Sequence, residues 1–398
     1  GFVAANSTPL YFHVVAPGDP FLWGRLVSIG STLAVAAAVA WRARAGGFAV
    51  AVALAAGWVA LAPVAIWGPA IKPDLLALAL TVAAVLLLAG TGRRGEERAG
   101  LAGLAVALAI FAKPTAALPA LALGAWLLGS RRTGSFAWYA GTGVFAAAAG
   151  LVMTPGGVRE LRAHVMERNA LPWSAEQALL LAALALMLIG VPLLLALLHR
   201  GARGALAAYL AGAAGIVLLG GREGATINYA LDLSAAAVLA LASVAPALAR
   251  SAAVPALLAT QLAAGAVLLD PFGMGVARSG TGAWGAPQRV SAARDLPPGF
   301  VLAEDSGLLV AQGRDPTVDD LFLWSRLAER GALDPEPLLR VIRAGSFVRV
   351  VSEVDLARLE AAPAYERQRW PAWLAAAVLE RYELEREDRG LFIYRPRS

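Results

Sequence analysis

The chain has 398 residues, of which 59% are hydrophobic and 16% are charged, and its mean hydropathy is +0.64. Soluble domains carry about 25% charged residues and about 45–50% apolar ones even with glycine counted, so this composition excludes a disordered chain and an ordinary soluble enzyme. The chain has no cysteine and three scattered histidines, and we therefore expect no disulfide, no metal site and no cofactor. We predict an α-helical polytopic membrane protein.

The basic charge is concentrated in the first two thirds of the chain. Residues 1–270 carry 17 Lys and Arg against 10 Asp and Glu, a net charge of +7, whereas residues 271–398 carry 17 Arg against 18 Asp and Glu, a net charge of −1. Arginines in the loops of a membrane protein set its topology, which explains the positive charge without nucleic acid. We expect membrane lipid as a partner and no nucleic acid.

Apolar stretches of the kind that membrane helices need recur along residues 21–270. In this domain we predict about ten transmembrane helices, at 21–41, 47–67, 74–90, 99–112, 114–129, 136–153, 175–198, 204–220, 229–249 and 251–269. Residues 1–20 lack the basic and apolar regions of a signal peptide. We interpret them as the remnant of a first extracytoplasmic loop in an N-terminally truncated chain.

The loops between these stretches alternate in charge. The more basic set carries ten arginines, in the loops 42–47, 91–100, 130–134, 199–204 and 249–251. The other set carries six Lys and Arg, so the positive-inside rule makes the first set cytoplasmic. We therefore expect a multi-pass protein of the inner (plasma) membrane, with everything after residue 269 on the extracytoplasmic side.

The stretch 99–129 decides this topology. As one helix it would be about 46 Å long, and it would place two arginine clusters on opposite sides of the membrane. Two short helices that meet at Lys113 and Pro114 keep both clusters on the cytoplasmic side. We predict the two-helix arrangement, with Lys113 beside a wet cavity, because a lysine below the membrane surface is tolerated only there.

The last 128 residues have a different character, with Arg and Glu interspersed. We predict a Gly-, Ala- and Pro-rich linker at 271–298 and a small extracytoplasmic α/β domain at 299–398. Its expected elements are strands at 300–303, 308–311 and 347–351, helices at 318–330, 335–343 and 370–381, and a hairpin at 382–394 that turns at Gly390.

Lysine is rare, since the chain has 32 arginines and only two lysines. Both lysines precede proline, in IKPD and AKPT, and both fall at extracytoplasmic turns of the predicted topology. Two interpretations stay open. In the first, each lysine is a cation at the end of a span, and its side chain reaches the membrane surface. In the second, Lys72 and Lys113 lie in one shared cavity and are a pair of point charges that bind a phosphate group.

Two other charged residues lie at the ends of predicted spans. Asp74 begins one span, where it either complements the helix dipole or places a carboxylate at the mouth of a membrane cavity. Arg25 lies near the start of the first span, where a cation inside the membrane is costly and is therefore a functional candidate.

The segment GGREGATINYALD at 220–232 places polar backbone at another outward turn. It lacks the GK[ST] sequence of a phosphate-binding P-loop. Arg222, Glu223, Asn228 and Tyr229 either line a site there or belong to a plain hairpin between two spans.

Five segments, taken in chain order, are similar to a known family. NSTPLYFHVVA followed by FLWGRLVS resembles the PPLYY and gRLlS region of polyprenyl-phosphate-dependent GT-C glycosyltransferases, the bacterial mannosyl- and aminoarabinosyl-transferase-like group. IKPDLLALAL resembles their second outer-loop acid and the helix that follows it. AGLAVALAIFAKPTAALPALAL resembles their pair of short helices with a lysine between them. GATINYALDLSAAAVLALA resembles their late turn with the NY sequence. The tail from VLAEDSGLLV to GSFVRVV resembles the outer α/β domain of bacterial members.

This resemblance implies a GT-C fold and the transfer of a hexosyl or pentosyl group from a polyprenyl-phosphate sugar donor to a lipid, glycan or protein acceptor in the cell envelope. It implies the following site residues: Asp74 as the catalytic carboxylate, Lys72, Lys113 and Arg222 as ligands of the donor phosphate, and Tyr11, Arg25, Glu223, Asn228 and Tyr229 as other pocket residues. The family's first outer-loop acid lies upstream of the PPLYY-like stretch, so we expect this chain to lack it.

Two other functional classes stay open from the sequence. A non-catalytic transporter or flippase of lipid-linked sugars would also need cations along its cavity. A membrane-anchored assembly protein would instead use residues 271–398 for binding.

Overall fold

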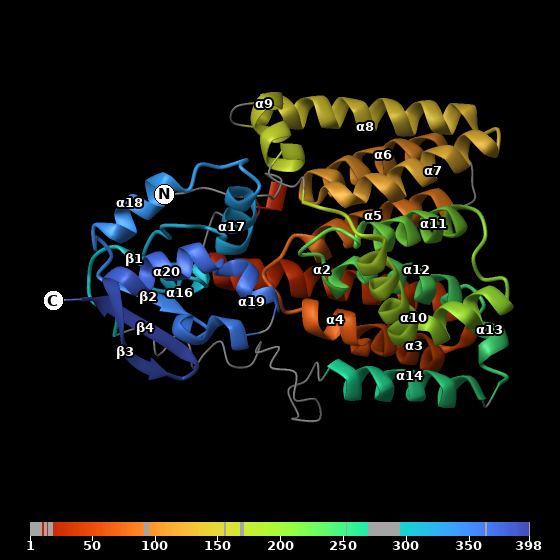
Figure 1. Cartoon of the computed structure of the whole chain (residues 1–398). Helices are drawn as coiled ribbons and strands as arrows, with labels where there is room; N and C mark the ends of the chain where they lie inside the picture. Colours follow the sequence, from red (N-terminus) through yellow and green to blue (C-terminus); the bar gives the residue numbers. More distant parts are fainter. Residues whose placement is uncertain are drawn as a thin grey trace. The chain divides into compact units, whose positions relative to one another are not determined.

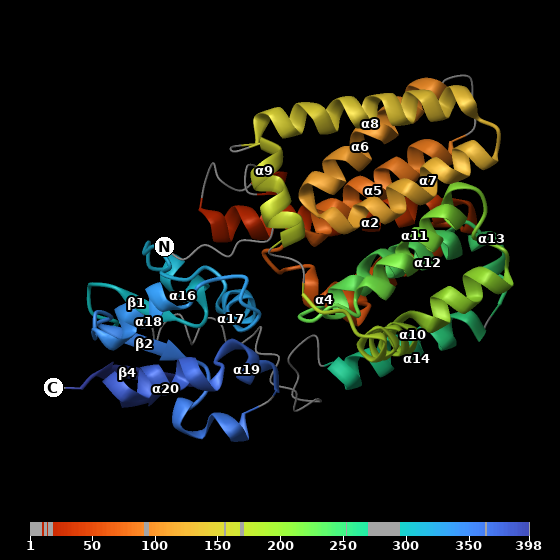
Figure 2. The ribbon, with the colours of Figure 1, turned by 45° about the horizontal axis from the view of Figure 1, so that its top comes forward.

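The computed structural model describes two compact units of the chain (Figures 1 and 2). One is helical and the other is a small α/β unit. The described residues are 10, 11, 14, 19–90, 95–154, 157–167, 171–251, 253–269, 295–362 and 364–397. Most of the predicted loop remnant 1–20 and of the predicted linker 271–298 lies outside these residues.

The helical unit consists of helices that follow one another with short connections. Their bounds are α2 (Pro20–Ala43), η1 (Arg44–Gly46), α3 (Phe48–Ala60), α4 (Ala62–Trp67), α5 (Asp74–Ala89), α6 (Gly95–Ala112), η2 (Pro114–Ala116), α7 (Ala117–Gly129), α8 (Thr133–Met153), α9 (Gly157–Arg162), η3 (Ala163–Glu167), α10 (Ala175–Leu198), α11 (Ala205–Leu219), η4 (Ile227–Ala230), α12 (Leu231–Ala242), α13 (Ala245–Leu248) and α14 (Ala253–Leu269).

Helix α12 lies in the middle of this unit, and nearly all of its residues are buried. It packs against α10, α11 and α2, while α5 packs against α6 and α2. In both ribbon views α8 and α14 lie at opposite edges of the helical unit. The small residues of α12, mostly Ala, let the surrounding helices approach closely, as is usual in membrane bundles.

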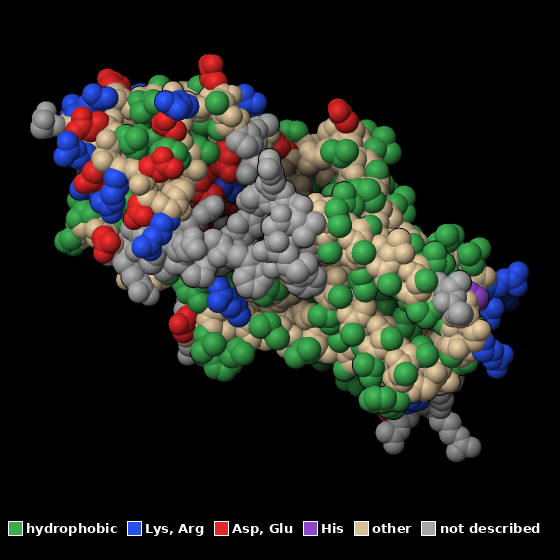
Figure 3. Space-filling model, turned by 90° about the horizontal axis from the view of Figure 1, so that it is seen from below, with side chains coloured by type: hydrophobic (Ala, Val, Ile, Leu, Met, Phe, Trp, Pro, Cys, Tyr) green, Lys and Arg blue, Asp and Glu red, His purple; other side chains and the backbone are tan. Residues whose placement is uncertain are grey.

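The outer surface of the helical unit is apolar. Among the described residues, three helices are long and apolar enough to cross a membrane, at Phe21–Gly46, Thr133–Val152 and Ala175–Leu198, and several shorter apolar helices accompany them. Figure 3 shows hydrophobic side chains over most of the visible face of this unit, with a group of Lys or Arg side chains at one end. A large exposed apolar surface of this kind fits a lipid environment.

Prolines divide two of the predicted spans. The stretch 47–67 forms α3 and α4, which meet at Leu61, whose backbone is extended (φ −58°, ψ 132°), and Pro63 lies in the first turn of α4. The stretch 229–249 ends in the separate short helix α13, which has Pro246 in its first turn. Proline lacks an N–H group and is best tolerated in the first turn of a helix, which explains both breaks.

The stretch 99–129 forms two helices, as the sequence predicted. Helix α6 ends at Ala112, and Lys113 has an extended backbone (φ −149°, ψ 120°) before η2 and α7 begin. The residue before a proline is disfavoured in the helical conformation, so Pro114 fixes this break.

The α/β unit contains a four-stranded sheet with the strand order β1-β2-β4-β3. Its elements are β1 (Val301–Ala303), α16 (Ser306–Val310), α17 (Leu321–Glu329), α18 (Glu336–Arg343), β2 (Arg349–Ser352), η5 (Leu356–Ala361), α19 (Ala364–Arg369), α20 (Ala372–Arg381), β3 (Tyr382–Asp388) and β4 (Leu391–Pro396). β1 and β2 are parallel, whereas β4 is antiparallel to both β2 and β3.

One predicted strand of this unit is wrong and one predicted turn is confirmed. Residues 308–311 belong largely to helix α16, because the Asp305 side chain accepts a hydrogen bond from the Gly307 N–H (2.9 Å) and caps that helix. The hairpin β3–β4 turns at Arg389 and Gly390, whose φ angles are 53° and 78°. Two positive φ angles in succession are typical of the two-residue turns that match strand twist.

Candidate active site

Asp74 lies at the first position of α5, directly after Pro73, and its side chain is only 6% exposed. Its Oδ1 atom accepts a hydrogen bond from Lys113 Nζ at 2.5 Å and another from Asn228 Nδ2 at 2.7 Å. Among the described residues, no hydrogen bond reaches the other carboxylate oxygen, Oδ2. One oxygen is therefore anchored by two donors, and the other accepts no hydrogen bond from these residues.

Lys113 reaches Asp74 because the chain leaves the helix at this residue. Its N–H group still closes the last turn of α6 on the Ala109 carbonyl (2.8 Å), while the extended backbone directs the side chain away from the helix axis. Its Nζ atom also lies 4.9 Å from the centre of the Tyr229 ring. A cation at this distance from an aromatic face is attracted by the ring.

The loop between α11 and α12 supplies the third part of the site. The Thr226 hydroxyl donates to Asn228 Oδ1 at 2.8 Å, which turns the amide nitrogen of Asn228 towards Asp74. Arg222 Nη2 donates to the Tyr229 hydroxyl at 3.1 Å. The Arg222 carbonyl accepts a hydrogen bond from Gln177 Nε2 (2.9 Å) at the start of α10, which fixes the loop from below.

Gly221 allows this loop to approach the residues before α10. A Cβ atom at this position would lie 2.4 Å from Trp173 Nε1 and 2.6 Å from the Ser174 carbonyl oxygen. Trp173 and Arg222 form an isolated antiparallel bridge there. The close approach requires glycine, since no other residue lacks Cβ.

Five of the predicted site residues thus form one continuous chain of contacts. In order these residues are Arg222, Tyr229, Lys113, Asp74 and Asn228. They come from three segments that are far apart in the sequence, which meet at one end of the helical unit.

Two other predicted and described residues, Lys72 and Tyr11, make no direct contact of this kind with Asp74. Lys72 is exposed, its carbonyl accepts a long hydrogen bond from the Ser28 hydroxyl (3.5 Å), and its charge acts on Asp74. Tyr11 is buried, and its hydroxyl would lie 3.2 Å from a Cβ at Gly24. Both lysines thus act on Asp74, but a shared cavity between them stays a prediction.

The two remaining predicted residues are Arg25 and Glu223. Arg25 is exposed, and none of the described residues pairs with its side chain. Glu223 is partly buried, and its N–H donates to the Pro172 carbonyl at 2.9 Å, which helps hold the loop.

Sequence reasoning missed Asp232 and Tyr209. Asp232 Oδ1 accepts a hydrogen bond from the Tyr209 hydroxyl at 3.0 Å, and the carboxylate interacts electrostatically with Lys113. A signal was available, because Asp232 lies in the first turn of an otherwise apolar membrane helix, one turn after Asn228. An ionisable residue in such a helix is a functional candidate in itself.

A second group of carboxylates lies in the α/β unit. Oxygen atoms of Glu304, Glu353 and Glu366 lie within 4.8 Å of one another, and Arg369 Nη1 lies 2.9, 3.8 and 3.3 Å from them. Burial raises the pKa of Glu304, but hydrogen bonds from Glu366, the Glu353 N–H and the Trp370 indole, with the charge of Arg369, hold that pKa below its ordinary value. The cation among these carboxylates is a guanidinium, so the cluster has a structural explanation.

No family model and no curated protein sequence matches the chain. Among solved structures, it is similar to ArnT from Cupriavidus metallidurans bound to undecaprenyl phosphate, with a TM-score of 0.62 and 14% identity over 98% of this chain and 87% of that chain. The apo state of the same protein gives a TM-score of 0.60 with the same identity and coverage. The chain therefore has the ArnT-like GT-C fold, and the predicted fold class is confirmed.

Proposed function

We propose that the protein is a GT-C glycosyltransferase that moves a sugar from a polyprenyl-phosphate donor to an acceptor on the extracytoplasmic face of the membrane. The observation that carries the proposal is the buried contact between Asp74, Lys113 and Asn228, at 2.5 and 2.7 Å. In a membrane unit, buried charges are costly and are generally retained for function. The ArnT-like fold supports the same class of reaction.

The donor is inferred from the cations and from the similar structure. ArnT from Cupriavidus metallidurans was solved with undecaprenyl phosphate, which has the charge and the apolar chain of such a donor. Here Lys72, Lys113 and Arg222 lie around one carboxylate and one aromatic ring. Fixed cations in a site shielded from water stabilise a phosphate far better than cations in bulk solvent.

In the proposed reaction, the bond between the sugar C1 and the donor phosphate oxygen breaks, and its electron pair stays on the phosphate. The acceptor hydroxyl oxygen forms the new bond to C1, and its proton moves to a base. We assign this role to Asp74 Oδ2, because Oδ1 is held by Lys113 and Asn228 while no described residue donates to Oδ2.

Lys113 then has two partners in the reaction. It holds Asp74 in place before the reaction, and it faces the phosphate as negative charge develops on the leaving group. The Tyr229 ring and Asp232 limit where its ammonium group can lie. Such preorganisation lowers the barrier, because the dipoles and charges need not rearrange during the reaction.

The test is sugar transfer by the full chain in vesicles, with a radiolabelled polyprenyl-phosphate sugar as donor. Lys113→Met should raise the donor KM and lower kcat, whereas Asp74→Asn should lower kcat by about 10²-fold or more. Arg203→Gln is the matched control, since Arg203 is exposed in the loop between α10 and α11. Unchanged kinetics in both site variants would contradict the proposed site.

The transporter alternative predicts a different result in the same vesicles. A flippase would move the labelled donor between leaflets without releasing free polyprenyl phosphate. In that case the donor moves between leaflets while its labelled sugar stays on the lipid even when acceptor is added. That result would favour transport over catalysis.

A further inference from the structure

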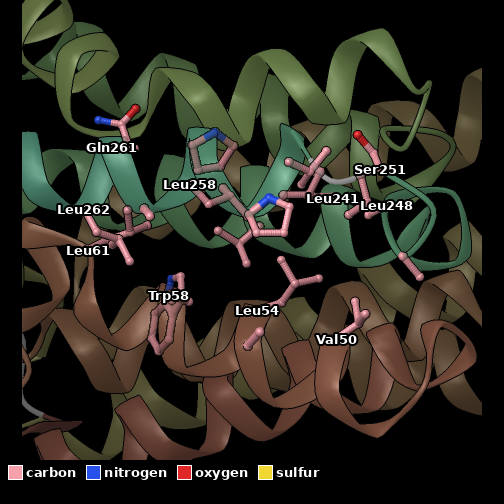
Figure 4. A pocket seen from close by; sticks show the side chains of 18 residues that line it. Val50, Leu54, Trp58, Leu61, Leu241, Leu248, Ser251, Leu258, Gln261 and Leu262 are labelled. Atoms are coloured by element: carbon pink, nitrogen blue, oxygen red, sulfur yellow. The ribbon is translucent and has the colours of Figure 1, made fainter.

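An apolar pocket of about 340 Å³ lies in the helical unit, away from the candidate active site. Figure 4 shows side chains from several helices pointing into it, among them Leu54 and Trp58 of α3 and Leu258 of α14. α12 forms another wall, through Leu241. An apolar space of this size inside a membrane protein is suited to a hydrocarbon chain.

Helix α14 packs mainly against α10 and less extensively against α3, and this leaves the space of the pocket between α14 and α3. Gln261 ties α14 to α10, because its Nε2 donates to the Met187 carbonyl at 2.5 Å and its Oε1 accepts from the Val191 N–H at 2.9 Å. The amide thus joins two backbone groups of α10 that lie one turn apart, and Val191 directly precedes Pro192. Gln261 lines the pocket, but both ends of its amide are already used.

The residues on both sides of one arginine line one end of the pocket. Ala249 and Ser251 line it, and Arg250 lies between them with an exposed side chain. The turn η1 packs against α13, since a Cβ at Gly46 would lie 2.8 Å from the Ala245 Cβ. This turn brings the exposed Arg44 to the same end of the helices, where its Nη1 atom donates to the Trp41 carbonyl at 2.9 Å and its guanidinium lies 3.6 Å from the centre of the Trp41 ring.

We propose that this pocket binds one acyl chain of an anionic phospholipid, with the lipid phosphate at Arg250 and Arg44. The volume supports one chain: a cavity of about 150 Å³ holds a benzene ring, so 340 Å³ holds roughly 14 carbon atoms. The charge supports an anionic headgroup, because guanidinium groups bind phosphate well. The inference does not rest on the proposed transferase activity.

The position of the pocket separates this lipid from the sugar donor. The candidate active site lies beside η4, at the start of α12, whereas Arg250 follows α13, beyond the end of α12. A donor phosphate at Lys113 and a lipid phosphate at Arg250 would therefore lie at opposite ends of the helix. The pocket is a second lipid site of the same unit.

Gly57 offers a direct way to fill the pocket. It lines the pocket, and a Cβ at this position would meet no described atom within 4 Å, so the side chain of Gly57→Phe begins in open space at the pocket. Gly141 on α8 is the matched control, because it is also helical and also has open space at Cβ. α8 lies at the edge of the helical unit opposite α14.

The experiment uses the full chain reconstituted in vesicles of equal parts phosphatidylglycerol and phosphatidylethanolamine. Native mass spectrometry after gentle extraction counts the retained lipid, and spin-labelled phosphatidylglycerol reports binding in intact vesicles. The wild-type protein and Gly141→Phe should retain one phosphatidylglycerol. Gly57→Phe should retain at least about tenfold less, since each buried methylene contributes roughly fourfold in affinity.

The charge is tested separately with Arg250→Gln. In this variant the preference for phosphatidylglycerol over phosphatidylethanolamine should be about fivefold smaller than in wild type. Arg131→Gln, on the turn between α7 and α8, should keep the wild-type preference. Three results would overturn the proposal: equal lipid retention in Gly57→Phe and wild type, no bound lipid by either method, or one-for-one displacement by undecaprenyl phosphate. The last result would assign the pocket to the donor chain and leave the transferase proposal intact.

Discussion

The ion pair between Asp74 and Lys113 allows a sharp test of how this site is built. The two side chains are 6% and 17% exposed, and their charged atoms lie 2.5 Å apart. We consider Lys113→Met, Asp74→Asn and the double variant. Lys72→Met is the matched control, because Lys72 also precedes a proline, but its side chain is exposed and no described carboxylate pairs with it.

The magnitude follows from Coulomb's law and from the cost of burying charge. At an effective dielectric constant of about 20, two unit charges 2.5 Å apart attract by about 7 kcal/mol, and the loss of hydration offsets much of this. Removing one partner leaves the other charge buried and unpaired, which costs about 3–5 kcal/mol. For a unit of this size, that lowers the melting temperature by roughly 6–20 °C.

The assay is thermal unfolding of the purified full chain in one detergent, followed by tryptophan fluorescence. Lys113→Met and Asp74→Asn should each melt well below wild type, and the double variant should regain most of the loss, because no charge is left unpaired. Lys72→Met should melt within a few degrees of wild type. If the double variant loses as much as the two single variants together, the two side chains do not act as a pair and this reasoning is refuted.

Three other outcomes are expected. Asn228→Ala removes a hydrogen bond to the charged Asp74 and should destabilise the helical unit by about 1.5–3 kcal/mol, measured by the same unfolding assay. Because the pKa of Glu304 is lowered in the folded protein, its carboxylate stabilises the fold at pH values above the ordinary pKa of 4.5. This stabilisation is lost as the pH falls through the lower pKa of the folded protein. Acid should therefore lower the melting temperature of wild type more than that of Glu304→Gln. An equal decrease in both proteins would show that Glu304 does not cause the loss of stability in acid. Gln261→Leu leaves two backbone groups of α10 without the amide that joins them and should cost about 1–3 kcal/mol; no change in the melting temperature would mean that water or a local shift replaces the amide.

The helices of the membrane unit were largely predictable, because each depends on local composition and on proline. The break at Lys113 follows from Pro114 alone, and α10 begins and ends at the residues predicted from its apolar run. The strand predicted at 308–311 failed for a local reason as well. Its apolar residues suit either structure, and the capping carboxylate of Asp305 decides for the helix.

Contacts between distant segments were not predictable in the same way. The sequence indicated that Asp74 and Lys113 are unusual, but not that they pair across 39 positions of the chain. The hydrogen bond between Tyr209 and Asp232 joins two helices whose relative rotation no local pattern determines. The apolar repeat in these helices is nearly uniform around the axis, as expected where lipid and protein surroundings are both apolar.

The two lysines show how equal sequence settings lead to different environments. Each stands before a proline, and each therefore lies just outside a helix start. Lys72 lies in the turn before α5 and is exposed, whereas Asp74 is the first residue of the helix and is buried. Lys113 reaches Asp74 from another segment, and Lys72 is left without such a partner among the described carboxylates. In the proposed site one cation is thus preorganised by a buried carboxylate, whereas the other keeps its charge at the surface, where salt screens it and where an approaching phosphate meets it first.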